Sequence, residues 1–117
     1  MDYSAAHELA RQLRESPEAT EYRRLKAVVE ESETTSALLK EYRRLQIAAQ
    51  ASALGGKRAD AEDMHRLQQI ASLLYAGTDT SRYLLAEMRL QQALADIYGI
   101  IAKAAGMSMD LPGMLET

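Results

Sequence analysis

The sequence contains no cysteine, no tryptophan and no phenylalanine. The absence of cysteine excludes disulfide bonds, thiolate metal ligands and a cysteine nucleophile, and it suits a reducing compartment. Because tyrosine is the only aromatic residue, the core has to be built from leucine, isoleucine, valine, methionine and alanine. Alanine and leucine favour helices, and small side chains allow helices to approach one another closely.

Long apolar runs and a basic excess are also missing. No uninterrupted apolar stretch approaches the roughly 20 residues needed to cross a bilayer, so we expect a cytoplasmic protein. The net charge is −3, whereas domains that bind duplex nucleic acid are usually basic. No glycine-rich phosphate loop, His-Glu-x-x-His motif or Gly-x-Ser-x-Gly motif occurs. We therefore expect a protein that is not an enzyme.

Apolar residues recur three and four positions apart along almost the whole chain, which is the period of an α-helix and not of a strand. Capping and helix-breaking residues divide the pattern into five helices: about 3–15, 17–31, a third that follows a polar junction at 32–36 and ends at Gly55 or Gly56, about 60–76 and 80–105. We expect one helical domain over residues 1–106.

The length of the last helix predicts the overall shape. A helix over residues 80–105 would be about 39 Å long, whereas a compact globule of this size has a radius of gyration of only about 13 Å. We therefore expect an all-α protein built on a long antiparallel helical hairpin with short N-terminal helices, and a bundle that is completed by forming a homodimer. The candidate dimer or core face comprises Leu84, Met88, Leu90, Leu94, Ile97, Tyr98 and Ile101.

The tail over residues 107–117 is apolar and rich in methionine, and Pro112 and Gly113 prevent it from continuing the helix. It either folds back on its own bundle or offers an adaptable contact to a partner protein. The candidate contact residues are Met107, Met109, Leu111, Met114 and Leu115.

Two residues of the last helix are singled out by their surroundings. Glu87 lies among apolar neighbours, so if it is buried it needs an arginine, tyrosine or glutamine from a facing helix. No second catalytic group accompanies it, which favours a structural role over that of a general base. Gly99 either marks a close crossing with another helix or is an exposed glycine that the helix tolerates.

The pentapeptide Glu-Tyr-Arg-Arg-Leu occurs twice, at residues 21–25 and 41–45. Its arginines and tyrosines could bind the phosphates and bases of RNA, which gives an alternative function as an RNA-binding accessory factor. The interspersed acids and the apolar spacing of the tyrosines favour solvated helix faces instead.

Glu62 and His65 form a Glu-x-x-His pair of the kind that di-iron helical bundles use twice. Because no second such pair occurs, we read both residues as an exposed first turn and expect no metal or other cofactor.

In its order of features the chain resembles the YlbF/YmcA family of small helical bacterial proteins, and within it the YheA-like branch. The resemblance is carried by Ser16-Pro17-Glu18, Tyr22 to Leu25, Leu38 to Tyr42 with Gln46, Gln50 and Gly55, and Tyr83 to Glu87 followed by Leu90, Leu94, Ile97 and Ile101. It implies an all-α cytoplasmic protein, often dimeric, which is a non-catalytic regulatory or scaffold protein. The resemblance also implies a place in complexes that control RNA maturation or developmental regulation in bacteria. Some members carry an iron–sulfur cluster on cysteines, which this chain lacks.

Overall fold

The computed structural model describes residues 1–107, which form five α-helices and no strand. This confirms the all-α prediction. The helices are α1 (Ser4–Arg14), α2 (Pro17–Glu30), α3 (Glu33–Leu54), α4 (Ala61–Ala76) and α5 (Thr78–Ala105).

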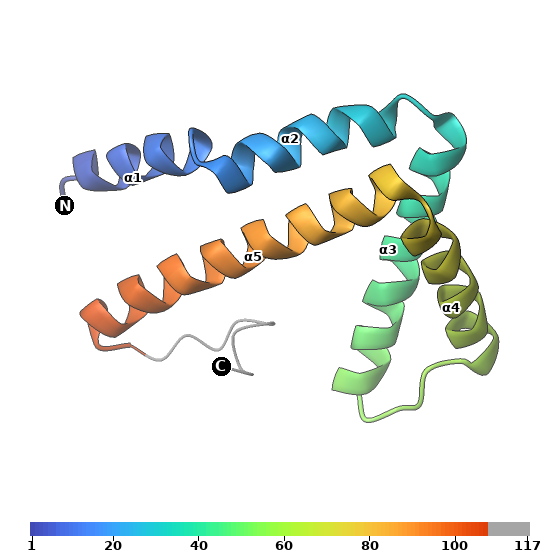
Figure 1. Ribbon diagram of the computed structural model, residues 1–117. Helices are drawn as coiled ribbons and strands as arrows, with labels where there is room; N and C mark the ends of the chain where they lie inside the picture. The colour runs from blue at the N-terminus through green and yellow to red at the C-terminus, as the bar shows by residue number, and fades with distance from the viewer. Residues whose placement is uncertain (108–117) are drawn as a thin grey trace.

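The helices form two arms that meet at a corner (Figure 1). In the long arm, α1 and α2 follow one another in nearly the same direction, and α5 runs antiparallel beside α2. In the short arm, α3 and α4 form an antiparallel hairpin that points away from the long arm. Two antiparallel pairs therefore occur: the long last helix α5 lies beside α2, and α3 lies beside α4.

Serine caps set the start of α2 and α3. The Ser16 hydroxyl accepts a hydrogen bond from the backbone N–H of Ala19 at 3.2 Å, and Pro17 occupies the first helical position, as the sequence predicted. The Ser32 hydroxyl accepts from the backbone N–H of Thr35, also at 3.2 Å. Because this cap lets α3 begin at Glu33, the prediction of a junction over residues 32–36 is wrong by about one helical turn.

The connection between α4 and α5 is only one residue long. Gly77 alone separates the two helices, and the Thr80 hydroxyl donates to the carbonyl oxygen of Leu74 at the end of α4. Helix α5 therefore starts at Thr78, two residues earlier than predicted, and no side chain caps it. At the ends of α3 and α5 the prediction is confirmed, because Gly56 and Gly106 both adopt the left-handed conformation, with φ of 70° and 71°.

The core lies at the corner, where α2, α3, α4 and α5 meet. Leu25, Leu45 and Leu74 are at most 2% exposed, and each comes from a different helix. Burial of one leucine side chain contributes roughly 1.5–3 kcal/mol, so these three hold the two arms together. Helix α1 has no fully buried residue; its Leu9 and Leu13 are half-buried.

The molecule is thin and extended. Its dimensions are 48 × 38 × 19 Å and its radius of gyration is 17.0 Å, compared with about 13 Å for a compact domain of this length. Within residues 1–107, no helix has a long enough apolar stretch to cross a membrane.

Candidate functional site: the corner groove

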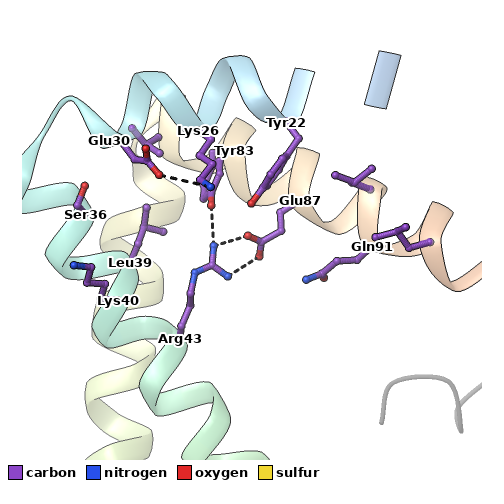
Figure 2. A pocket seen from close by; sticks show the side chains of 13 residues that line it. Tyr22, Lys26, Glu30, Ser36, Leu39, Lys40, Arg43, Tyr83, Glu87 and Gln91 are labelled. Carbon is purple, nitrogen blue, oxygen red and sulfur yellow. Dashed lines mark hydrogen bonds and ion pairs between the residues drawn. The ribbon is translucent and has the colours of Figure 1, made fainter. Parts of the chain in front are cut away.

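Glu87 on α5 is paired with Arg43 on α3, across the corner between the two arms (Figure 2). Arg43 Nη1 donates to Glu87 Oε1 at 3.0 Å, and Nη2 donates to Glu87 Oε2, so the contact is bidentate. The Glu87 side chain is 17% exposed and that of Arg43 is 39% exposed. This is the partner that the sequence analysis required for a buried carboxylate at position 87.

Two tyrosines extend the pair into a network. Arg43 Nη2 also donates to the Tyr83 hydroxyl oxygen at 2.9 Å. The ring of Tyr83, which is buried, stacks on that of Tyr22 from α2 with centroids 5.6 Å apart and planes inclined by 25°. Side chains from α2, α3 and α5 thus meet in one cluster, which fixes how the short arm sits on the long arm.

The network forms one wall of a groove on the inner side of the corner, with a volume of about 640 Å³. Its apolar lining comes from Val29, Leu39, Leu90 and Leu94, while Lys26 and Lys40 stand at the α2 and α3 sides (Figure 2). Lys26 lies 3.9 Å from Glu30. Within residues 1–107, no carboxylate lies within ion-pair distance of Lys40.

The surroundings of Arg43 and Tyr83 determine the protonation states of these two groove residues. Hydrogen bonding to Glu87 raises the pKa of Arg43, which keeps the guanidinium charged. Burial, followed by the neighbouring Tyr22 hydroxyl, raises the pKa of Tyr83, so this phenol stays protonated at neutral pH. A charged arginine and a protonated tyrosine can bind and orient a ligand, but neither accepts a proton.

The repeated pentapeptide makes the same local structure twice. Arg24 pairs with Glu21 and Arg44 pairs with Glu41, each through two guanidinium nitrogens. Tyr22 and Tyr42 pack against the core.

The third position of the pentapeptide differs between the two copies. Arg23 donates to the carbonyl oxygen of Arg14 at 2.7 Å, whereas Arg43 faces Glu87. The interpretation as solvated faces therefore holds for Arg24 and Arg44, which are exposed, but it is wrong for Arg43, which turns into the groove. Each of these four arginines therefore has a hydrogen-bond partner within the chain.

The Glu-x-x-His pair is in the first turns of α4, and both Glu62 and His65 are exposed. Within residues 1–107, no three histidine, aspartate or glutamate side chains are grouped as a metal site would require.

The structure divides the candidate dimer or core face on α5. Leu84 is buried inside the chain, and Leu90 and Ile97 are half-buried, so these residues belong to the core or its edge. Met88, Leu94, Tyr98 and Ile101 are exposed. Since successive residues are about 100° apart around a helix, Leu94, Tyr98 and Ile101 form one stripe, while Met88 points to a different side.

The remaining residues singled out by the sequence analysis are Gly99 and those of the C-terminal tail. A β-carbon built on Gly99 would meet nothing within 4 Å, so this glycine marks no close crossing within the chain. Met107 is exposed. The other tail residues, Met109, Leu111, Met114 and Leu115, lie outside the described residues.

Comparison with known proteins identifies the family. Residues 3–105 match the profile of the family described as control of competence regulator ComK, YlbF/YmcA. The chain belongs to the YlbF/YmcA family. It is 31% identical over 115 residues to a UPF0342 protein of Caldicellulosiruptor saccharolyticus, covering 98% of this chain and 96% of that protein. A UPF0342 protein of Symbiobacterium thermophilum is 32% identical over 110 residues, with 94% and 96% covered.

A solved structure shares the fold of this YlbF/YmcA protein. The protein of unknown function DUF964 from Bacillus stearothermophilus superposes with a TM-score of 0.73, at 17% identity, over 89% of this chain and 91% of that one. At this identity the similarity concerns the fold alone. The assignment to the YheA-like branch stays a prediction, because the names of these proteins specify no branch.

Sequence reasoning missed the central residue of the groove, Arg43. One signal was available, since Glu87 required a partner and an arginine was among the expected types. Position 43 could not be chosen from several arginines, because the pairing joins residues 44 positions apart and depends on how α3 crosses α5.

Proposed function

We propose that this protein is a non-catalytic adaptor that works as a homodimer and binds another protein. The observation that carries the proposal is the unpartnered apolar surface on the second half of α5. Ile101 is 54% exposed there, and Leu94 and Tyr98 are exposed on the same stripe of the helix. Contiguous exposed apolar surface in a monomer is typical of an interaction site.

The accessible surface area supports the proposal that a second copy of the chain packs against this apolar surface. The accessible surface of 8923 Å² exceeds by about 2,600 Å² the value expected for a compact 13 kDa monomer. Residues 108–117 would account for about 1,600 Å² of this excess even if they were fully extended in solvent. At least about 1,000 Å² remain, which is more than the roughly 800 Å² that each partner buries in a standard interface.

Helix α1 supports the same proposal. It contributes no fully buried residue, and its Leu9 and Leu13 are only half covered. Helices of a second copy packed against α1 and α5 would complete the bundle. The family description refers to control of a competence regulator, and we infer that this chain likewise acts through a regulatory complex in which it touches another protein with its tail.

Ile101→Asp tests the homodimer. Light scattering and sedimentation should give twice the 13.0 kDa chain mass for the wild type at micromolar concentration. The variant should dissociate with at least a tenfold higher Kd, because one isoleucine per copy loses roughly 2 kcal/mol of burial. Thr78→Asp, at an exposed position in the first turn of the same helix, is the matched control and should stay dimeric. A monomeric wild type would refute the homodimer.

Affinity purification from the native bacterium tests the adaptor role. Recovery of a second protein with the full chain, and its loss when residues 107–117 are removed, would support a tail contact. Self-association alone, together with turnover of a small molecule that Glu87→Gln abolishes, would overturn the non-catalytic proposal.

A further inference from the structure

We infer that the short arm is a docking site for an amphipathic helix of a partner protein. The site is a groove between α3 and α4, which we name the hairpin groove, on the arm that points away from α2 and α5 (Figure 1). The inference rests on the proposed adaptor role and deepens it, because it names the kind of partner segment and where it binds. The hairpin groove shares no residue with the dimer surface proposed on α5.

The size and shape of the hairpin groove suit a helix. Its volume is about 1190 Å³, which exceeds the roughly 300–1,000 Å³ of small-molecule pockets. Its lining includes positions 34, 37, 38 and 41 of α3 and positions 66, 69, 70 and 73 of α4. Each set follows the i, i+3, i+4, i+7 spacing of one helix face, so two antiparallel helices border one channel with a continuous stripe each. A third helix can lie between such stripes, as in helix-in-groove recognition.

The lining of the hairpin groove is apolar at its base and small on the α3 side. Ile70 is buried and Leu38 is half-buried, whereas Leu73 on α4 is 60% exposed. Thr34 and Ala37 on α3 are exposed, and their small side chains allow a docked helix to approach closely. A helix with a stripe of leucine and alanine would cover Leu73 and fit this lining.

The two ends of the hairpin groove carry opposite charge. Glu33 lines one end, and within residues 1–107 no basic side chain lies within ion-pair distance of it. At the other end Glu41 is paired with both Arg44 and Arg66, so two guanidinium groups face one carboxylate. Positions 33 and 41 are about 12 Å apart along α3. The complementary helix therefore carries a basic and an acidic residue about eight positions apart.

The charges also fix the direction of the docked helix. A helix is stabilised by acidic residues in its first turn and basic residues in its last turn. Such a helix places its acidic start over Arg66 and its basic end over Glu33, which makes it parallel to α4 and antiparallel to α3. Its negative C-terminal end then lies near the positive N-terminal end of α3, which is favourable.

A synthetic peptide tests the docking on the full-length chain. The probe is a fluorescein-labelled peptide of about 16 residues, long enough to form a helix, with a leucine–alanine stripe, a glutamate near its start and a lysine about eight positions later. Fluorescence anisotropy should give a Kd below about 100 µM. A second peptide with the glutamate and the lysine exchanged should bind about fivefold more weakly. Absence of binding at about 1 mM, or equal Kd values for the two peptides, would overturn the inference.

Variants of the hairpin groove test where the peptide binds. Leu73→Asp removes the exposed apolar side chain and should raise the Kd at least tenfold. Gln68→Asp makes the same charge change at an exposed position on a different side of α4 and should leave the Kd unchanged. Unchanged affinity in Leu73→Asp would place the peptide elsewhere and refute the inference.

Reversing the charge at one end of the groove tests the orientation. Glu33→Lys should abolish or invert the fivefold preference between the two peptides, because the lysine of the first peptide then meets a like charge. The ratio of the two Kd values is compared between the variant and the wild type, so differences in helicity between the peptides cancel. A ratio that is the same in Glu33→Lys and in the wild type would contradict the inferred charge complementarity.

A second copy of the chain is the competing occupant of the hairpin groove. Light scattering should give the same mass for Leu73→Asp as for the wild type, and a lower mass would place a second copy in the groove and overturn the inference. Ile101→Asp should bind the peptide with unchanged Kd, so the peptide measurement stays readable if the homodimer proposal fails. Failure of the adaptor proposal is read separately, from affinity purification, which does not depend on the peptide.

Discussion

The contact between Arg43 and Glu87 offers a quantitative test of what holds the two arms at their observed angle. Breaking a fully buried ion pair costs about 3–5 kcal/mol, whereas an exposed pair contributes about 0.2–1 kcal/mol. Here Glu87 is 17% exposed and Arg43 is 39% exposed, so the contact lies between these limits. We expect Arg43→Gln to lower the free energy of unfolding by about 2 kcal/mol, because it leaves the more buried charge without its cation.

Glu87→Gln should cost less, about 1 kcal/mol, because the half-exposed guanidinium can be hydrated when its carboxylate is lost. The two single variants and the double variant form a cycle, measured by urea unfolding at one fixed protein concentration, and the coupling energy should be about 1 kcal/mol. The melting temperature should fall by roughly 4 °C for each kcal/mol lost. The same cycle on Arg24 and Glu21, an exposed pair within α2, is the control and should show a clearly smaller coupling. Equal coupling in both cycles would refute the conclusion that the pair across the corner stabilises the fold.

Three further predictions follow from burial and charge. Leu74→Ala should lower the free energy of unfolding by about 3 kcal/mol, since this leucine is 1% exposed, whereas Ile47→Ala, at 66% exposure, should change it by less than about 0.5 kcal/mol in the same urea titration. Hydrogen bonds from neighbouring arginines lower the pKa values of Glu21 and Glu41. The stabilisation that these two carboxylates provide should therefore be present above the ordinary glutamate pKa and disappear as the pH falls through the lowered values. Circular dichroism should show this loss as declining helicity. In a gel-shift assay at 200 mM salt the chain should not retain RNA, because Arg24 and Arg44 are already paired with glutamates. RNA binding by the wild type that is lost in Arg44→Glu would contradict this prediction.

The sequence predicted the helices well because helix boundaries depend on local chemistry. Ser16 with Pro17, Asp60 and the two left-handed glycines each act within one turn of the chain, so their effects can be read from neighbouring residues. The error at Ser32 is also local, since a run of polar residues is compatible with either a loop or a capped first turn.

The candidate site was less predictable because it depends on contacts between helices. That Glu87 needed a partner followed from its apolar neighbours, but the choice of Arg43 required the crossing of α3 and α5. For the same reason the sequence could not separate the core residues of α5 from its exposed apolar residues. Leu84 and Leu94 are both leucines on α5, yet only Leu84 is covered by neighbouring helices of the described chain.

The thickness of 19 Å has a consequence for the evolution of the sequence. A helix with its side chains is about 10–12 Å across, so the molecule is less than two full helix diameters deep and has room for few enclosed side chains. Within residues 1–107, the fully covered apolar positions are confined to a small set around the corner. Most other positions face water or a partner and can change at little cost to folding, which lets proteins about 31% identical to this chain align with it over nearly their whole length.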